Sequence, residues 1–325
     1  MHATTDETQT VGRDGSRMDG PRRRTREQLL EAAGRLHIEG ASRMKDLELK
    51  AAVQRATNRY MGRSWFFDEF PRFYETGNSG PGARINARHD VLIAAHKHLI
   101  QDRTILDIGS HDGRWGFAAI IAGAKHVTCI EPRAELVESA KENYEAYGID
   151  PSRYSFHTAD ALEALRELRP QVDTVFLFGI LYHVYYHVEL VKAIHQTEAS
   201  AVIVDTNVAP LDGLPAQLKE SGQRMAYANA ISFYTQRVDR INNGAMEIFP
   251  GAGVTIAGCP TRRAVHLLFE AFQFEVAEIP WDAHLSRWRK IRPAAVRYGL
   301  KDYAAGERGT FLAQRRPRDE PAEDG

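Results

Sequence analysis

The sequence predicts an α/β protein whose core is a doubly wound sheet, and three observations support this fold class. From residue 104 onward, short apolar runs of strand type alternate with helical patterns and are joined by short connections. The first apolar run leads directly into a glycine-containing turn, Gly109 to Gly113, and a helical pattern follows it. The 325 residues, 43% of them hydrophobic, are enough for one large α/β domain with an accessory region.

Seven segments have the length and apolar character of buried strands, and five segments between them show helical periodicity. In the first strand, 104–108, the residues Ile105, Leu106 and Ile108 form an apolar run of the kind found inside a parallel sheet. The other predicted strands are 126–130, 154–157, 174–178, 201–205, 274–279 and 309–314, and the predicted helices are 114–122, 133–146, 161–168, 187–196 and 261–272.

The regions around this alternation complete the predicted domain organisation. Residues 1–24 are polar and charged without periodicity, so we predict a disordered tail, and residues 317–325 form a second tail. Residues 25–100 are predicted to be an N-terminal helical cap on the substrate side of a main domain at 101–316. Residues 207–260 follow the fifth strand and are predicted to be a lid insertion, because substrate lids are placed at the carboxyl ends of strands.

Two patterns support the helical assignment of residues 25–100. Thr25 and Gln28 have the spacing of a capping box, and apolar residues recur after them at helical intervals. An aromatic run between Trp65 and Tyr74 is expected to pack this region onto the main domain, with a cap over a substrate cleft as the alternative. A further helix is predicted over residues 85–100.

Composition narrows the classes of partner. A formal net charge of -1 and a pI near 6.9 offer no global attraction for polyanions, which makes a nucleic-acid partner unlikely. No apolar run approaches the ~18 residues that cross a bilayer, and residues 1–24 lack the apolar core of a secretion signal. We therefore predict a cytoplasmic protein with no membrane partner, and the oligomeric state is left open, with a homodimer as one alternative.

Cys129 and Cys259 lie far apart outside any Cys-x-x-Cys motif, which predicts free thiols and no metal site.

The turn after the first strand predicts a nucleoside-binding site that is not a dinucleotide site. Gly109 and Gly113 remove side chains where a nucleoside can approach the backbone, and the helix that begins near Arg114 directs free N–H groups toward the ligand. A dinucleotide-binding turn reads G-x-G-x-x-G, but His111 and Arg114 stand at the second and third glycine positions.

Two further motifs follow at predicted strand ends. Glu131 ends the second strand 24 residues after Asp107, at the position of an acid that accepts hydrogen bonds from a ribose. Three motifs therefore stand in order: Leu106-Asp-Ile-Gly-Ser-His-Asp-Gly113, Cys129-Ile-Glu-Pro-Arg133 and Thr158-Ala-Asp-Ala161. This set resembles the ordered motifs of class I S-adenosylmethionine-dependent methyltransferases, and the resemblance covers about Arg88 to Arg315.

The resemblance implies a Rossmann-like seven-stranded methyltransferase sheet and S-adenosyl-L-methionine as the cofactor. It implies that Asp107 and Gly109 hold the methionine end, that Glu131 holds the ribose hydroxyls and that Asp160 holds the adenine amino group. A solvated charge is the alternative for Glu131, and a helix N-cap, compatible with the cofactor role, is the alternative for Asp160. The remaining residues implied for the pocket by their place in the motifs are Ser110, Gly113, Pro132 and Ala161.

The segment Gly179-Ile-Leu-Tyr-His183 follows the fourth strand and resembles the matching segment of a methyltransferase subgroup that includes the tRNA wobble-uridine carboxymethyl transferase. In such folds the segment lies beside the transferring carbon. The resemblance therefore implies that Phe178 and Gly179 line the sulfonium and that Tyr182, His183 and His187 face the acceptor. A nearby histidine can remove the proton of the acceptor, an effect worth about 10²–10⁴ in rate.

Structural alternatives remain open for the catalytic candidates. His183 is either a base that positions the acceptor or a hydrogen-bonded structural histidine, and His187 also starts an amphipathic helix. Asp205, at the end of the fifth strand, is a further candidate for the acceptor site.

Missing motifs narrow the chemistry. The motif Asn/Asp-Pro-Pro-Tyr of adenine and glutamine-amide N-methyltransferases would fall at residues 177–180, which read Leu-Phe-Gly-Ile. Phe178 and Gly179 offer no ligand where metal-dependent catechol-type enzymes carry an Asp, so no metal is predicted. Arg far outnumbers Lys, which hints at a GC-rich genome and specialised metabolism.

We therefore expect an enzyme that transfers a methyl group to O or N of a small-molecule metabolite in a biosynthetic pathway. One alternative is a tRNA-modifying alkyl transferase of carboxymethyl type. An alternative from another class is a nucleotide-binding oxidoreductase or a non-catalytic cofactor-binding module.

Overall fold

The structure is a computed structural model, and it describes residues 25–35, 40–45, 49, 52–53, 65–76, 82–209, 229–238, 251–291 and 293–317. The chain divides into two compact units, Met1–Ser64 and Trp65–Gly325. The tails predicted at 1–24 and, apart from its first residue, at 317–325 lie outside the described residues, as do residues 210–228 and 239–250 of the predicted lid.

In the first unit, helix α1 (Arg26–Arg35) begins at the predicted capping box. The backbone N–H of Thr25 donates to Oε1 of Gln28 at 3.0 Å, and the backbone N–H of Gln28 donates to Oγ1 of Thr25 at 3.3 Å. Gly40, with a positive φ of 70°, precedes a short 3₁₀ turn, η1 (Ala41–Arg43). A small apolar cluster of Leu29, Ala33, Leu49 and Val53 is buried in this unit.

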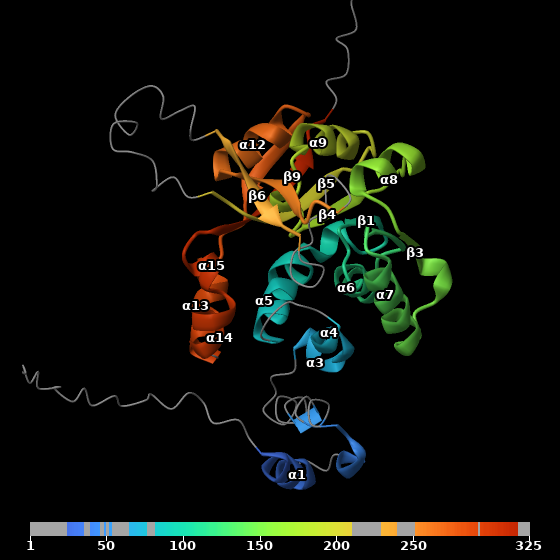
Figure 1. Cartoon of the computed structure of the whole chain (residues 1–325), viewed down its shortest axis with the longest axis vertical. Helices are drawn as coiled ribbons and strands as arrows, with labels where there is room; N and C mark the ends of the chain where they lie inside the picture. The colour runs from blue at the N-terminus through green and yellow to red at the C-terminus, as the bar shows by residue number, and fades with distance from the viewer. Residues whose placement is uncertain are drawn as a thin grey trace, which may run out of the picture. The chain divides into compact units, whose positions relative to one another are not determined.

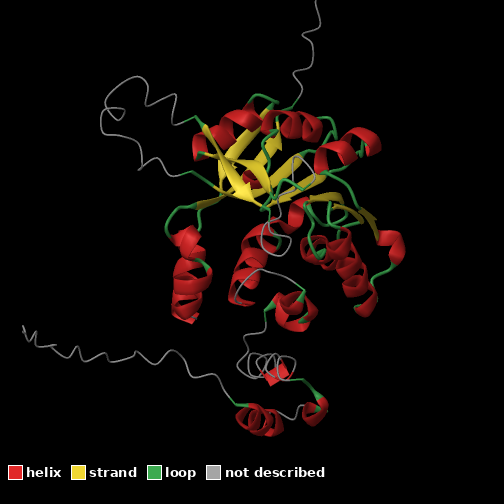
Figure 2. Cartoon of the chain, viewed as in Figure 1, coloured by secondary structure: helices red, strands yellow, loops and turns green. Residues whose placement is uncertain are grey.

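The second unit is built on a sheet of seven strands in the order β3-β2-β1-β4-β5-β9-β8, shown in yellow in Figure 2. The first five strands pair in parallel, whereas β9 is antiparallel to both β5 and β8. This confirms the predicted seven-stranded sheet. The strands are β1 (Thr104–Ile108), β2 (His126–Ile130), β3 (Tyr154–His157), β4 (Thr174–Phe178), β5 (Ala201–Asn207), β8 (Phe274–Glu278) and β9 (Arg308–Arg315).

Helices cover both faces of this sheet (Figure 1), because strands of a parallel sheet are apolar on both sides and must bury both. Side chains such as Leu106 and Ile108 pack with residues of α8 (Ala161–Leu168), α9 (His187–His195) and α12 (Arg262–Glu270). Ile105, on the other face, belongs to a cluster with residues of α5 (Gly82–Leu92), α6 (Arg114–Ile121) and α7 (Ala134–Ala146).

The aromatic run of residues 65–74 joins the second of these clusters. Phe67, in helix α3 (Phe66–Glu69), and Phe73, in helix α4 (Arg72–Glu75), are buried among the rings of Phe117 and Trp115. Phe67 and Phe73 therefore pack onto the main domain, as expected for the aromatic run.

The predicted helix at 85–100 is wrong in its second half. Helix α5 ends at Leu92, and a 3₁₀ segment, η2 (Ala94–Leu99), follows with non-helical dihedral angles at His96 (φ -110°, ψ 23°). The kink lets Nδ1 of the buried His96 bond with the carbonyl oxygen of Val91 at 2.9 Å.

The sequence prediction missed two further parts of the fold. The described ends of the insertion form a two-stranded antiparallel sheet, in which β6 (Ile231–Arg237) pairs with β7 (Val254–Pro260). Between β8 and β9 the chain forms three helices, α13 (Asp282–Ile291), α14 (Pro293–Gly299) and α15 (Lys301–Ala304). The shorter connections are 3₁₀ turns, η3 (Pro151–Arg153) and η4 (Leu181–His183).

The packing of α6 on the sheet predicts the effect of one substitution. A methyl group on Gly116 would lie 2.7 Å from Oη of Tyr144, 2.9 Å from Sγ of Cys129 and 3.0 Å from Val127, all in a closed cluster. We expect Gly116→Ala to lower the free energy of unfolding by about 1–3 kcal/mol, although alanine is the better helix former. Urea unfolding followed by circular dichroism measures this loss. Gly34→Ala is the control, because nothing lies within 4 Å of the added methyl in α1, and equal losses for both variants would contradict the packing argument.

Candidate functional site

The turn between β1 and α6 has a backbone that only a few residue types adopt easily. Gly109, His111 and Gly113 all have positive φ, at 70°, 55° and 77°. A Cβ on Gly113 would also lie 2.8 Å from the ring of Tyr144, so both conformation and space require glycine there. The turn therefore brings backbone N–H groups to the start of α6 without covering them with side chains.

Asp107, at the end of β1, keeps one oxygen without a partner. Its Oδ2 accepts from the backbone N–H of Gly116 at 3.0 Å, but neither Oδ1 of Asp107 nor Oγ of Ser110 has a hydrogen-bond partner among the described residues, and both atoms are buried. Burial raises the pKa of Asp107 to about 7. Two orphaned polar atoms beside a glycine turn fit a polar ligand at this position.

Asp112 fixes the outer half of the turn and was missed by sequence analysis. Its Oδ1 accepts from Nε of Arg114 at 2.6 Å and its Oδ2 accepts from Oγ1 of Thr76 at 2.6 Å. Asn143 of α7 donates to both the backbone oxygen of Asp112 and Oγ1 of Thr76. Burial alone would raise the pKa of Asp112, but Arg114 and His111 beside it hold that pKa below its usual range. The motif gives an acid at this position, but the partner Thr76 comes from 36 residues earlier in the chain.

Glu131 joins the turn to the end of β2. Its Oε2 accepts from the backbone N–H of His111 at 3.0 Å, and its Oε1 accepts from the backbone N–H and Nε of Arg133 at 3.2 and 2.7 Å. The side chain is buried, so the structure does not place it as a solvated charge. A carboxylate has about four acceptor positions, which leaves Oε2 able to accept one more bond from a ribose hydroxyl. Pro132 directly follows Glu131 at this strand end.

Asp160 is the N-cap of α8, as the structural alternative predicted. Its Oδ1 accepts from the backbone N–H groups of Leu162 and Glu163, at 2.8 and 3.4 Å, and Ala161 is the first residue of the helix. Its Oδ2 accepts from the hydroxyl of Tyr186 at 2.6 Å. The cap and the hydroxyl together fix the carboxylate at the end of β3, near the edge that carries Asp107 and Glu131.

The chain after β4 turns sharply at Gly179, whose φ is 82°. Phe178 is buried and stacks on Phe176, with ring centroids 4.8 Å apart. The backbone N–H of Gly179 donates to the carbonyl oxygen of Asp205 at 2.7 Å. A Cβ on Gly179 would lie 3.5 Å from Nη2 of Arg308 and 3.9 Å from Oη of Tyr182, so these two side chains flank the turn.

Tyr182 and His183 lie in η4, under the β6–β7 sheet. The hydroxyl of Tyr234 donates to the carbonyl oxygen of Tyr182 at 3.3 Å, and the side chain of Gln236 lies beside His183. Burial and the nearby charge of Arg308 lower the pKa of His183 to about 4, while Gln236 opposes that shift. His183 is therefore a neutral imidazole at neutral pH, and its low pKa makes it a weak base in this state.

His187 is the first residue of helix α9, which is the structural alternative given for it in the sequence analysis. Its ring is buried at the start of α9, and Nε2 bonds with the carbonyl oxygen of Gly258 in β7 at 3.0 Å. The backbone N–H of Gly258 donates to the carbonyl oxygen of Val184 at 2.9 Å. A Cβ on Gly258 would lie 2.5 Å from Cε1 of His187. These contacts make His187 an anchor for β7, and they argue against the expected role of facing the acceptor.

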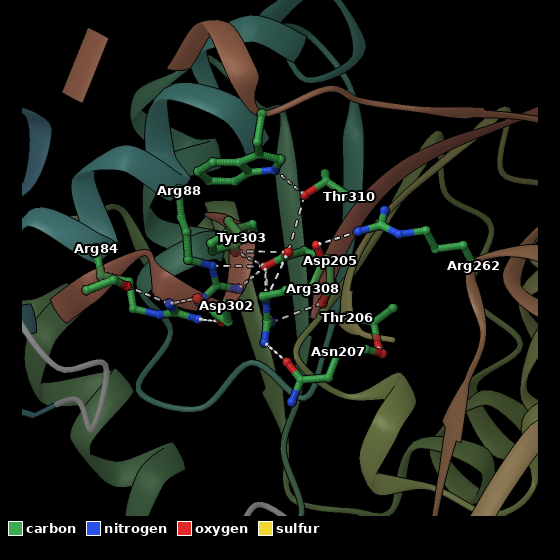
Figure 3. A network of polar contacts seen from close by, with 12 residues as sticks. Arg84, Arg88, Asp205, Thr206, Asn207, Arg262, Asp302, Tyr303, Arg308 and Thr310 are labelled. Atoms are coloured by element: carbon green, nitrogen blue, oxygen red, sulfur yellow. Dashed lines mark hydrogen bonds and ion pairs between the residues drawn. The ribbon is translucent and has the colours of Figure 1, made fainter. Parts of the chain in front are cut away.

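Asp205 is enclosed by a network of donors, which Figure 3 shows from close by. Its carboxylate accepts from Arg88 at 2.6 and 2.9 Å, from Nε and Nη2 of Arg308 at 3.1 to 3.2 Å, from the hydroxyl of Tyr303 at 2.9 and 3.0 Å and from Oγ1 of Thr310 at 3.3 Å. Burial would raise the pKa of Asp205, but the two arginines hold it well below its usual range. A saturated carboxylate cannot take a proton from a substrate, so we correct the expectation that Asp205 acts directly on the acceptor.

The comparison with known families matches the part of the chain that contains these strand-end motifs. Residues 105–202 match the family model described as "Methyltransferase domain". The match runs from β1 to β5 and contains the three motifs in order. The chain carries a class I S-adenosylmethionine-dependent methyltransferase domain. S-adenosylmethionine is the cofactor of this domain, and the residues that would hold it are Asp107, Ser110, Glu131 and Asp160, with the glycine turn between the first two strands.

Curated relatives match over a short part of this chain. "Ribosomal RNA large subunit methyltransferase K/L" of Shewanella sp. (strain W3-18-1) is 31% identical over 75 residues, which are 23% of this chain and 11% of that protein. "Ribosomal RNA large subunit methyltransferase I" of Klebsiella pneumoniae (strain 342) is 29% identical over 77 residues, 24% of this chain and 19% of that protein. The chain thus spans between about a tenth and a fifth of the length of these relatives.

Solved structures cover more of the chain at lower identity. A crystal structure of an S-adenosylmethionine-dependent methyltransferase from Mesorhizobium loti is 16% identical, covers 72% of this chain and 100% of that chain, and has a TM-score of 0.48. The N-terminal domain of EvdMO1, in the presence of SAH and D-fucose, is 16% identical, covers 74% and 85% of the two chains, and has a TM-score of 0.47.

Three other sequence expectations can be compared with the described residues. Both cysteines are free thiols in the structure. Within the described ranges, no group of three or more His, Cys, Asp or Glu side chains is arranged to hold a metal ion. Each helix in the described part of the chain is too short or too polar to cross a membrane.

The raised pKa of Asp107 predicts a pH-dependent stability. Its pKa is 3.8 in the unfolded chain and about 7 in the fold, so the folded protein binds more protons between these values, and stability falls as the pH rises through this window. We expect Asp107→Asn to reduce the stability lost between pH 5 and pH 8 by about 2–3 kcal/mol, at about 1.36 kcal/mol per pKa unit. Urea unfolding of both proteins at the two pH values measures the difference, in which the effects of other titrating groups cancel. Identical losses in both proteins would show that Asp107 is charged in the fold at neutral pH.

Proposed function

We propose that this protein transfers a methyl group from S-adenosylmethionine to O or N of a small-molecule acceptor. The observation that supports a small acceptor is the cover over η4. Tyr234 and Gln236 of β6 contact Tyr182 and His183, the residues expected to face the acceptor. A wall of side chains at this point suits a small molecule better than a base on a polynucleotide.

The chain's own residues supply positioning and a proton acceptor. The bound cofactor supplies an electrophilic methyl group on a sulfonium, and Phe178 with Gly179 is the expected wall beside it. His183, a neutral imidazole with a pKa near 4, is the proposed acceptor of the proton that the acceptor oxygen or nitrogen loses. Gln236 of the insertion lies beside the imidazole, and both Nδ1 of His183 and Oε1 of Gln236 are buried without a hydrogen-bond partner within the described ranges.

The domain roles belong to the same proposal. In it, residues 101–316 form the cofactor-binding domain, whose core also contains Phe67 and Phe73, and 207–260 act as the lid. The contacts of β6 and β7 with residues 182–187 support the last assignment. A biosynthetic role in the cytoplasm completes the proposal.

RNA is the second candidate acceptor, because the curated relatives are named as ribosomal RNA methyltransferases. The Gly179–His183 segment also resembles that of a tRNA-modifying subgroup. A net charge of -1 does not favour this reading.

Replacement of His183 tests its proposed role as the base. We expect His183→Ala to keep the affinity for S-adenosylhomocysteine and to lower turnover at least tenfold, because only the step that moves the proton loses its acceptor. Calorimetry measures the affinity. Turnover is measured by incubating a candidate metabolite with enzyme and cofactor and following the mass increase of about 14 Da, the mass of one transferred CH₂. His187→Gln is the comparison variant, and its loss should appear in stability. Unchanged turnover in His183→Ala would remove His183 from the mechanism.

Ligand binding distinguishes the three classes of function. We expect S-adenosylhomocysteine to bind and NAD not to bind, because His111 and Arg114 replace the second and third glycines of a dinucleotide turn. Calorimetry with each ligand checks this, and binding of NAD alone would establish the oxidoreductase class instead. Total tRNA is the third ligand, and tight binding that weakens steeply with salt would favour the RNA acceptor.

A further inference from the structure

Two arginines share one carboxylate in the buried network around Asp205 (Figure 3). Arg88 of α5 and Arg308 of β9 are 8% and 5% exposed, and the carboxylate between them is fully buried. Both guanidinium groups bond to it at 2.6 to 3.2 Å.

The other members of the network do not balance the second positive charge. Thr310 and Asn207 are neutral, and burial raises the pKa of Tyr303, which keeps its hydroxyl protonated. The neighbouring Arg84 and Asp302 form a pair of their own, with two bonds of 2.7 Å. Among the described residues, the network therefore carries an excess of one positive charge.

A buried charge without a counterion costs several kcal/mol, so this arrangement favours an anion that completes it. Arg88 has the capacity to bind one. Its Nε and Nη2 bond to Asp205, whereas no described residue accepts a hydrogen bond from Nη1. Its guanidinium lies 4.9 Å from the ring centroid of Trp115, which holds the plane of the fork.

The position of the network relative to the sheet favours the acceptor over the cofactor. The cofactor motifs follow β1, β2 and β3, whereas Asp205 and Arg308 lie on β5 and β9, beyond β4 in the strand order. Arg308 flanks Gly179, with Nη2 3.5 Å from the Cβ position, and packs over the ring of Tyr182 at 5.5 Å. The excess charge thus lies beside the residues that flank the proposed transfer site.

We propose that Arg88 binds a carboxylate group of the acceptor through Nη1, so that the substrate is a carboxylate-bearing small molecule. Arg308 contributes the second positive charge, since its three nitrogens already donate to Asp205 and Asn207. This inference rests on the proposed function and narrows it to one substrate class. A single carboxylate matches the single excess charge, and it can accept a charge-assisted hydrogen bond from Nη1 of Arg88.

Acetate is the probe for this site, because it is a small carboxylate that does not depend on the rest of the acceptor and has acetamide as a neutral analogue of the same shape. The measurement is the melting temperature of protein saturated with S-adenosylhomocysteine, at pH 7.5 and constant ionic strength, in acetate, in chloride and in neutral acetamide. We expect acetate to raise the melting temperature by about 2–4 °C relative to both controls. Arg88→Gln should abolish this difference, because it leaves a neutral pair of Arg308 and Asp205. Arg88→Lys, which keeps the charge, should retain part of it.

The control for charge is Arg263→Gln, which removes one arginine from the exposed surface of α12 and should leave the acetate effect intact. Equal melting temperatures of the wild-type protein in acetate and acetamide would overturn the proposal without any variant. An acetate effect that appears only when S-adenosylhomocysteine is absent would assign the site to the cofactor's own carboxylate and would also overturn it. Failure of S-adenosylhomocysteine to bind would instead contradict the proposed function.

Discussion

The carboxylate of Asp205 joins segments that lie far apart in the sequence, and the acceptor side of the domain depends on it. Arg88 comes from α5, Arg308 and Thr310 from β9, and Tyr303 from α15. The indole of Trp281 extends the network by donating to Oγ1 of Thr310 at 2.8 Å. A neutral residue at position 205 would leave two guanidinium groups buried without a counterion, which costs more than the pair contributes when it is intact. The network therefore fixes how the segment before β1 and the helices after β8 sit against the end of the sheet.

A second set of contacts attaches the insertion to the chain after β4. The backbone of Gly258 bonds to Val184, the ring of His187 bonds to the carbonyl of Gly258, and Tyr234 bonds to the backbone of Tyr182. Each of these bonds uses a backbone oxygen, but two of the three depend on the side chains of His187 and Tyr234. The side chain of Gln236 also lies beside the imidazole of His183. Strands β6 and β7 are thus attached to the segment after β4 by backbone and side-chain contacts.

Strands could be predicted closely because a parallel sheet buries both faces, which leaves continuous apolar runs such as Ile105 to Ile108. The N-cap at Asp160 could be predicted as well, since its bonds are local in sequence. The β6–β7 sheet could not, because Phe233 and Tyr234 are exposed and give no clear apolar alternation. Asp205 was misjudged for a different reason. A strand-end carboxylate looks the same in sequence whether it faces a ligand or two arginines that arrive from more than 100 residues away.

The packing of residues 65–92 makes the stretch before β1 part of the same compact unit as the sheet. Phe67, Phe73 and Ile85 precede β1, yet they are buried with Phe117 in the cluster beneath the sheet. Thr76 also holds Asp112 in the cofactor turn. A polypeptide shortened to the seven-stranded sheet and its connections, starting at residue 101, would present these rings' binding surface to water and would be prone to aggregate. The stretch from Trp65 to the first strand therefore belongs to the same compact unit as the sheet and contributes to its core.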